Sequence, residues 1–269
     1  MYSGTTFGKR SGNLIGVHQR IDRLARRRLT ALLNPKVTFP TMAEILHFEG
    51  DNGPDGIKRK SPSVDEPWHF IDPEKLDDKA LVEVIEDHRI NLARALKKND
   101  QHRAAFEAAW MAHAVVDGLT PAHHVPLGDM IEELFGKPHY ERSSVRDKNV
   151  IKGHNRRDTL SKNWSYWGNK GIFMTHLSFE LGIATAILGA RFDKNLINEK
   201  DLRELNEKGY KIVFRSILDE VVSLKTYERY MKKGWTSGLG RTVKTRLIPL
   251  ITKAVILGWY SASIEKASK

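Results

Sequence analysis

The sequence predicts an all-α fold, built as a single-domain bundle of several helices. Six long segments carry apolar residues three and four positions apart, the spacing of a helix that buries one face, and no stretch of similar length alternates with a period of two. With 269 residues and 40% hydrophobic content, the chain is long enough to bury the core of one large domain. The six segments are 12–33, 76–98, 101–118, 170–190, 199–232 and 242–265.

The first segment, 12–33, combines an apolar side with a basic run. His18, in "GVHQRIDRLARR", lies on the apolar side of this expected helix. The run "RLARRR" is either a patch for nucleic acid or lipid or a solvated helix face, and its residues favour neither interpretation. This helix therefore carries one candidate site residue and one candidate contact surface.

The segments within 199–265 are expected to complete the bundle. In 209–224 an unbroken apolar stripe recurs at helical spacing, which indicates a helix with one face in the core. The stripe consists of Tyr210, Val213, Phe214, Ile217, Leu218 and Val221. This part of the chain adds packing surface rather than site residues.

Two irregular stretches interrupt the helical pattern. Residues 47–75 are rich in Gly, Pro and Asp, and residues 136–168 are basic and end in Trp164, Tyr166 and Trp167. Loops of this length inside a compact domain are either functional or disordered. The three aromatic side chains either cover a core edge, the commoner arrangement, or stack on bases or enter a lipid interface. No repeat, low-complexity tract or domain boundary divides the chain, so we expect all 269 residues to form one domain.

Composition limits the chemistry and the partners. Because the sequence has no cysteine, disulfides and thiolate metal sites are excluded, and any metal must be held by imidazole and carboxylate groups, ligands suited to zinc. The formal net charge of +11 favours an anionic partner, such as nucleic acid, an anionic membrane surface or a phosphorylated substrate. No run approaches the roughly 18 to 20 apolar residues that span a bilayer. The start, "MYSGTTFGKRSGNL", lacks the apolar region of a secretory signal, so we expect a cytoplasmic protein without a transmembrane segment.

The strongest chemical signal is "AAWMAHAVVDGLTPAH". His113 and Asp117 are four residues apart, which places them on one face of a helix in chelating geometry. Gly118 and Pro121 end that helix, and the turn can carry His123 back toward the same face. Burying a carboxylate beside imidazoles without compensation is unfavourable, so the motif predicts a metal site.

A second pair with the same spacing, His176 and Glu180, lies in "FMTHLSFELG". The apolar residues around it favour a buried helix, and two chelating pairs on two helices suggest a bundle core that holds metal. A rival pair, His154 and Asp158 in "GHNRRD", lies in a polar stretch with no apolar face. We therefore prefer His176 and Glu180 as ligands.

Two upstream motifs add further candidates. "EPWHFIDP" places His69 on a short aromatic segment between prolines, and "GDNGPDG" offers Asp55, with Asp51 as its competitor, in a glycine-rich loop. Asp72 is a candidate for a hydrogen bond to a ligand imidazole, which zinc-binding histidines usually make. Among the other histidines, His124 is the one expected nearest the site.

These motifs together resemble the zinc-dependent phospholipase C family, whose fold is shared with the S1/P1-type nucleases. The family's central motif, a histidine, three residues, an aspartate, five residues and a histidine, is matched by His113, Asp117 and His123. Its aspartate about 14 residues before a histidine in a "W-H-[FY]-I-D" context is matched by Asp55 and His69. The later histidine and carboxylate match His176 and Glu180, the early helix histidine matches His18, and the resemblance spans about residues 12–190.

The resemblance implies a metal cluster of up to three zinc ions in a cleft between helices. The implied ligands are, for the first ion, Asp55, His69 and His113; for the second, His18 and Asp117, which also bridges to the first; and for the third, His123, His176 and Glu180. Closely spaced ions clamp a phosphate and neutralise charge on its oxygens. Asp55, as a base that orients water, and Asp117 are the candidate catalytic residues.

The sequence departs from the family at two points. In secreted members the metal beside the early histidine is also bound by the amino group of a mature N-terminal Trp, whereas this sequence begins Met-Tyr. The interval between His123 and His176 is long and contains the basic, aromatic stretch. The departures put in question the ligand set near His18 and the access of substrate to the site.

Three functions are therefore weighed. The first is a metal-dependent phosphodiester hydrolase resembling zinc-dependent phospholipase C, in which zinc-bound hydroxide attacks phosphorus. The second is a single-strand nuclease of the related type, which the basic charge supports and the use of Glu180 in place of aspartate opposes. The third is a metal-stabilised binding module without turnover, whose metal sites would be coordinatively closed.

Overall fold

Helices make up 72% of this computed structural model, and the prediction of an all-α fold is confirmed. The structure describes residues 1–4, 15–60, 70–75, 77–125, 127–138, 141–142, 144–192 and 196–265. Within these ranges there is no strand. The elements in chain order are α2 (Val17–Leu29), α3 (Met42–His47), the 3-10 turn η1 (Gly50–Asn52), α4 (Pro54–Lys60), α5 (Ala80–Lys97), α6 (Gln101–Gly118), the 3-10 turn η3 (Pro121–His124), α7 (Leu127–Phe135), α8 (Val145–Asn149), α9 (Arg156–Trp167), α10 (Ile172–Ile187), α11 (Glu199–Lys208), α12 (Tyr210–Ser223), α13 (Thr226–Lys233), α14 (Ser237–Thr242), the π-helical segment η5 (Val243–Leu247) and α15 (Ile248–Ile264).

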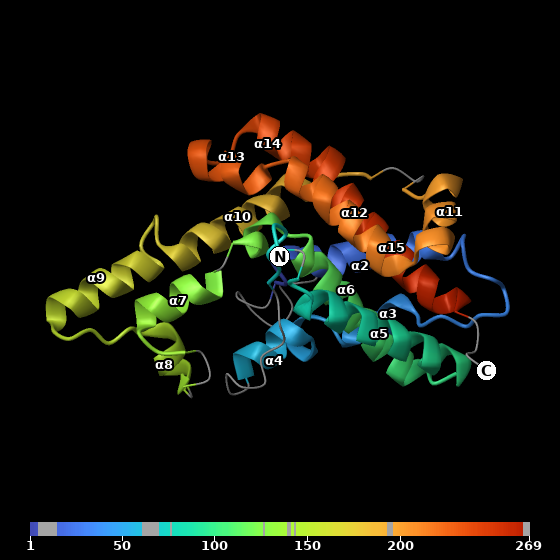
Figure 1. The fold of residues 1–269 in the computed structure, drawn as a ribbon, viewed down its shortest axis with the longest axis horizontal. Helices are drawn as coiled ribbons and strands as arrows, with labels where there is room; N and C mark the ends of the chain where they lie inside the picture. Colours follow the sequence, from blue (N-terminus) through green and yellow to red (C-terminus); the bar gives the residue numbers. More distant parts are fainter. Residues whose placement is uncertain are drawn as a thin grey trace.

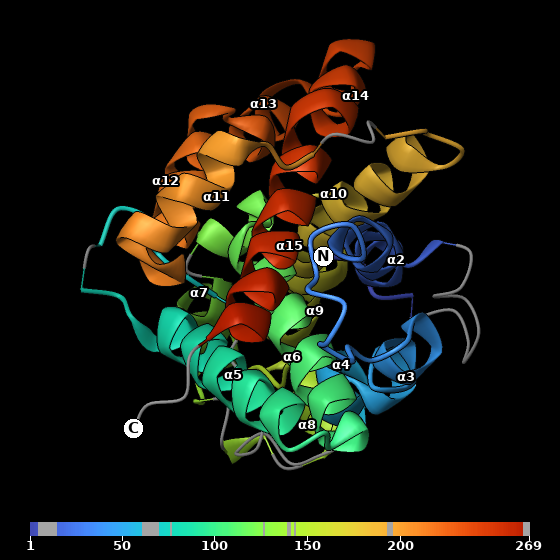
Figure 2. The same ribbon diagram turned by 90° about the vertical axis from the view of Figure 1, so that its right-hand side faces the viewer.

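The last helix, α15, forms the centre of the core. It packs against α2, α5, α6 and α12, and Figure 2 shows it running between these helices. Trp259 on α15 is fully buried, and its indole Nε1 donates a hydrogen bond of 2.9 Å to the carbonyl oxygen of Ala108 on α6. The helices that carry His18, His113 and Asp117, α2 and α6, are thus both fixed against one central element.

The same C-terminal helix is the longest apolar element in the described part of the chain. Ser237–Ile264, which joins α14, η5 and α15, is a continuous helix of 28 residues that would be long and apolar enough to cross a membrane by length and composition. In its most apolar window, 72% of the residues are buried inside the protein. Such burial is what a core helix requires, so its hydrophobicity is accounted for by packing.

The segment 199–232, expected as one helix, is divided into α11, α12 and α13. Gly209 and Lys225 have positive φ angles of 78° and 49°, which interrupt the right-handed helix. Within α12 the predicted apolar stripe from Tyr210 to Val221 is buried, as expected. Hydrophobic periodicity correctly predicted the buried face of α12. It did not predict where the helices end, because each of the two interruptions depends on the backbone conformation of a single residue.

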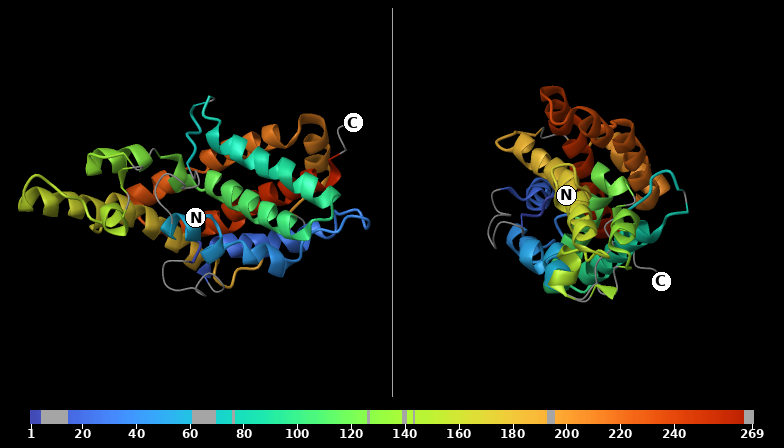
Figure 3. Two further views of the ribbon diagram at one scale, coloured as in Figure 1. Left: turned by 90° about the horizontal axis from the view of Figure 1, so that it is seen from below. Right: turned by 90° about the vertical axis from the view of Figure 1, so that its left-hand side faces the viewer.

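The prediction of an irregular stretch over 136–168 is wrong for its second half, which forms α9. The N-cap side chain of Asn155 accepts a hydrogen bond of 2.9 Å from the backbone N–H of Asp158, which satisfies one of the free donors at a helix start. The helices α7, α8 and α9 extend away from the bundle, and we call residues 127–167 the arm (Figures 1 and 3). α9 is therefore fixed by a cap at its start and by the buried side chain of Tyr166 near its end.

Candidate metal centre

The central motif forms as the spacing predicts. His113 and Asp117 lie one turn apart on the buried face of α6, with 3.2 Å between His113 Nε2 and Asp117 Oδ2. The helix ends at Gly118, where an added Cβ would lie 2.8 Å from Leu81 Cδ2 and 3.2 Å from Phe214 Cζ, so a larger residue would make these two side chains shift. The turn η3 then returns the chain, and His123 Nδ1 comes within 3.7 Å of Asp117 Oδ1.

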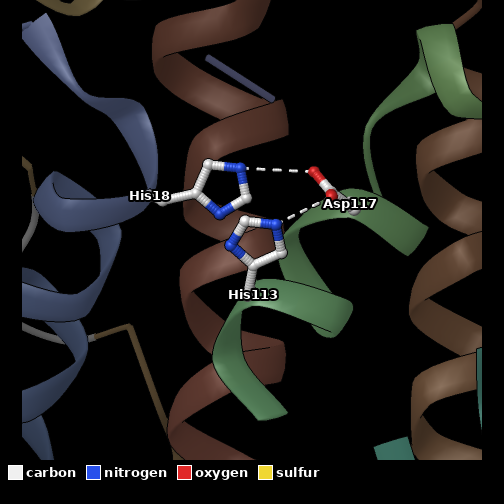
Figure 4. A group of neighbouring side chains, drawn as sticks. All are labelled: His18, His113 and Asp117. Carbon is white, nitrogen blue, oxygen red and sulfur yellow. Dashed lines mark ion pairs between the residues drawn. The ribbon is translucent and has the colours of Figure 1, made fainter. Parts of the chain in front are cut away.

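His18, His113 and Asp117 form the first of two groups whose potential ligand atoms all lie within 4.8 Å of one another (Figure 4). His18 projects from α2 toward α6, and its Nε2 is 3.2 Å from Asp117 Oδ1. The two imidazole rings are stacked with centroids 4.1 Å apart. The first group is almost fully buried, since each member is at most 2% exposed.

The second group is formed by His123, His176 and Glu180. Glu180 Oε1 is 3.0 Å from His123 Nε2 and 2.9 Å from His176 Nε2, so one carboxylate oxygen faces both imidazoles. The His123 and His176 rings are stacked with centroids 5.0 Å apart. His176 and Glu180 are one turn apart on α10, so this second helical pair lies where the spacing predicts.

The α-amino group of Met1 joins the two groups. Its nitrogen lies 2.5 Å from Asp117 Oδ1 and 3.2 Å from Glu180 Oε1, while the Met1 carbonyl oxygen accepts a hydrogen bond of 2.7 Å from His18 Nε2. In all views of the fold the N-terminus lies near the centre of the molecule (Figures 1 to 3). A primary amine therefore lies beside His18, where the departure from the resembled family put the ligand set in question.

Two buried carboxylates beside the first group were not predicted. Glu49, which follows α3, accepts a hydrogen bond of 3.0 Å from His113 Nδ1 and so fixes the ring with Nε2 toward Asp117. Asp22 is buried on α2, four residues after His18, and Glu49 is among the groups that raise its pKa. The spacing of His18 and Asp22 repeats that of His113 and Asp117, so the sequence contained a signal for Asp22 but none for Glu49.

The remaining upstream candidates have different positions. Asp55 lies in the first turn of α4, and its Oδ1 is 3.7 Å from His113 Nε2. His69 lies outside the described residues, but its neighbours reach the site, because Ile71 N–H donates a hydrogen bond of 3.2 Å to the His123 carbonyl and the Phe70 ring lies 5.3 Å from the His123 ring. Asp55 therefore lies beside the first group, on its more exposed side.

Three secondary candidates lie apart from both groups. Asp72, expected to contact a ligand imidazole, instead pairs with Lys75 at 3.2 Å. His124 Nε2 donates a hydrogen bond of 2.9 Å to the carbonyl oxygen of Gly118. Asp158 accepts a hydrogen bond of 2.8 Å from the backbone N–H of His154 at the start of α9, so this rival pair serves as part of a helix cap.

The network of charges shifts the ionisation of its members. Burial raises the pKa of Asp117, but the Met1 amine, His123 and His113 outweigh burial and hold it well below the usual range. The pKa of Glu180 is also held well below its ordinary value, since the Met1 amine and His176 outweigh burial. Both carboxylates are therefore ionised at neutral pH.

The cationic partners respond in opposite directions. Burial lowers the pKa of the Met1 amine, but Asp117 and Glu180 outweigh it and raise the value to about 10. Glu49 and Asp117 likewise overcome burial at His113 and raise its pKa well above the ordinary value. Burial and the Met1 charge lower the pKa of His123 to about 4, so this imidazole is neutral and able to bind a metal.

The donor set of both groups fits a zinc-like ion. Each group offers two imidazoles and one carboxylate, which are ligands that zinc accepts. Two buried ring nitrogens, His18 Nδ1 and His176 Nδ1, have no hydrogen-bond partner among the described residues. Each of the two buried groups could therefore hold a metal ion.

Comparison with models of protein families, with curated proteins and with solved structures finds no match to this chain.

Proposed function

We propose that the protein is a metal-dependent phosphodiester hydrolase resembling zinc-dependent phospholipase C. The observation that carries the proposal is the contact between the two buried groups: Asp117 lies 3.2 Å from His113 of one group and 3.7 Å from His123 of the other. Ions held in adjacent groups could act on one phosphate together, which is the chemistry of two-metal hydrolases.

The chain's own residues would have separate roles in this reaction. The first group would hold one ion through His18, His113 and Asp117, and the second group would hold another. Zinc, when bound, supplies charge neutralisation on phosphate oxygens and lowers the pKa of water. Glu49 orients the His113 ring through its hydrogen bond to Nδ1.

Asp55 is proposed as the residue that orients water and takes its proton. Its side chain is 28% exposed and its Oδ1 lies 3.7 Å from His113 Nε2, so solvent reaches this carboxylate, whereas Asp117 is buried. A general base must combine contact with the reacting site and access to a proton acceptor. Asp55 meets both conditions by its position.

A single-strand nuclease is the second candidate, since the formal net charge of +11 favours a polyanionic substrate. Affinity for single-stranded DNA that falls steeply with salt, together with its cleavage, would support this alternative. Turnover confined to lipid dispersions would support the phospholipase.

The test is to measure zinc content and hydrolysis of a generic phosphodiester, bis(p-nitrophenyl) phosphate, in the wild type and in Asp117→Asn. We expect the variant to lose bound zinc and to lose activity by at least about 10- to 100-fold. Asp219→Asn, which changes an exposed aspartate on α12, is the matched control and should retain both. Full zinc content and full activity in Asp117→Asn would refute the proposal. If the wild type binds zinc but does not hydrolyse the substrate, the proposal is also refuted, and the protein is a metal-stabilised binding module.

A further inference from the structure

Exposed apolar side chains are concentrated on the arm. Nine large hydrophobic residues are exposed in the described part of the chain, and five of them belong to the arm. These five are Met130 (41% exposed), Val150 (42%), Leu160 (72%), Trp164 (72%) and Trp167 (38%). Single exposed apolar residues are normal on a protein surface, but a cluster on one projecting element indicates a contact surface.

On α9 the exposed apolar residues form one stripe. Leu160, Trp164 and Trp167 are four and three residues apart, so they lie on the same side of the helix. The other side of α9 is buried through Tyr166, whose ring packs edge-on to Phe135 of α7 at 5.4 Å. Trp167, at one end of the stripe, is partly covered, since its ring contacts Phe173 of α10 at 4.8 Å and its indole Nε1 donates a hydrogen bond of 2.8 Å to the Asn149 carbonyl oxygen. Leu160 and Trp164, each 72% exposed, are the part of the stripe that faces solvent.

Basic residues surround this stripe. Between residues 136 and 170 the sequence has nine Lys or Arg and three Asp or Glu. Arg156 and Arg157 are exposed in the first turn of α9, on the same side as Leu160, and neither forms an ion pair with a described residue. An exposed helix face with Trp and Leu in its centre and Arg at its margin is typical of an element that lies in a membrane interface.

We propose that this face of α9 docks peripherally on an anionic lipid bilayer. Leu160 and Trp164 enter the boundary between headgroups and acyl chains, and Arg156 and Arg157 contact the lipid phosphates. A lipid surface fits better than a nucleic acid, because bases need aromatic platforms in a basic groove and Leu160, at the centre of the stripe, offers no ring for stacking.

The position of α9 gives the docking a consequence for the metal centre. α9 is followed after four residues by α10, which carries His176 and Glu180, and the two helices pack against each other. The Tyr166 ring also stacks on Phe173 of α10 at 5.5 Å. Docking would hold α10, and with it His176 and Glu180, close to the membrane. That a lipid phosphodiester reaches the metal centre in this way rests on the proposed function.

The experiment is sedimentation of the full-length, zinc-loaded protein with vesicles of phosphatidylcholine alone or with about one quarter phosphatidylglycerol. The wild type should bind the anionic vesicles and lose binding in high salt. The double variant Arg156→Ser/Arg157→Ser should bind about 30-fold more weakly. Leu160→Ser/Trp164→Ser should lose at least about tenfold in affinity.

The control is Ile212→Ser/Met231→Ser, which removes two exposed apolar residues outside the arm, 55% and 58% exposed, and should bind as the wild type does. Equal binding by the control and both arm variants, or no binding by the wild type, would overturn the docking. Stronger binding to a single-stranded oligonucleotide, lost in the arm variants and not competed by vesicles, would reassign the face to nucleic acid. Vesicle binding without any phosphodiester hydrolysis would refute the proposed function and leave the docking in place, and hydrolysis without vesicle binding would do the reverse.

Discussion

The metal centre and the α9 stripe depart from the usual distribution of residues in opposite ways. The centre buries ionisable groups, including Asp117 at 1% exposure, whereas the stripe exposes Trp164 at 72%. Both arrangements cost free energy in the isolated chain, because buried charges lose hydration and exposed apolar groups order water. Such departures are more informative about function than the well-packed core.

The difference between the two regions is where their partners lie. In the centre the ionisable groups find their partners within the chain, as the Met1 amine faces Asp117 and Glu180, and the two groups of imidazoles and carboxylates there could hold a metal ion. On the α9 stripe only Trp167 packs within the protein, against Phe173, whereas Leu160 and Trp164 are 72% exposed, which is why we propose a partner from outside the chain for them. A buried polar cluster thus indicates a small ligand, and an exposed apolar stripe indicates a surface.

The largest expected effect is stabilisation of the centre by zinc. A ligand at 1,000 times its dissociation constant stabilises the folded state by about 4 kcal/mol, which for a chain of this size corresponds to about 8 to 16 °C in Tm. We expect such a rise on adding zinc to metal-stripped wild type, measured by calorimetry, and a much smaller rise in Asp117→Asn. An equal rise in both proteins would mean that zinc binds elsewhere.

The second expected effect is a pH dependence of zinc affinity. The pKa of the Met1 amine is raised to about 10 and that of His113 is raised well above its ordinary value, so both groups carry protons at neutral pH. Zinc must displace those protons to use these groups as ligands, so its affinity should rise by about tenfold per pH unit for each proton released. Competition with a chelator between pH 6 and about 9 measures the slope, and a flat profile would exclude His113 and Met1 as ligands.

A smaller effect is expected from Asp22, whose pKa burial and the nearby Glu49 raise well above the ordinary value. The folded protein keeps a proton there that the unfolded chain releases above its own pKa of about 3.9, so stability falls as pH rises from that value toward the folded pKa. Asp22→Asn removes this loss. We expect the variant to gain on the order of 1 kcal/mol at pH 7, or about 2 to 4 °C in Tm, and little near pH 4. Destabilisation at both pH values would show that the carboxylate is needed in its charged form.

The smallest effect is expected for the arm in solution. Leu160→Ser should change the free energy of unfolding by less than about 0.5 kcal/mol, because the side chain is 72% exposed. Phe179→Ala, which empties a fully buried position on α10, should cost about 3 to 5 kcal/mol and is the reference for a core residue. Denaturant unfolding compares the two. A large loss in Leu160→Ser would mean that the stripe has a partner within the chain.

Local spacing predicted more of the centre than of the arm. His113 with Asp117, and His176 with Glu180, lie one helical turn apart, and that relation follows from helix geometry alone. Residues 136–168 were expected to be irregular because they are rich in basic residues, yet Asn155 and Asp158 cap a helix over 156–167 and Tyr166 is buried on it. Hydrophobic periodicity detects a helix with a continuous apolar face, and it misses a short helix that packs through few side chains, as α9 does through Tyr166.

The sequence by itself determined the all-α class, the donor types available to a metal and the two helical pairs of ligands, since each depends on composition or on neighbours within one turn. Only the tertiary structure decided that Met1, Glu49 and His18 meet at α6, and that the Trp164 side of α9 is left uncovered. The reason is physical: these relations depend on how separate helices pack around α15, and side chains distant in sequence carry no local signal of the neighbours they will have.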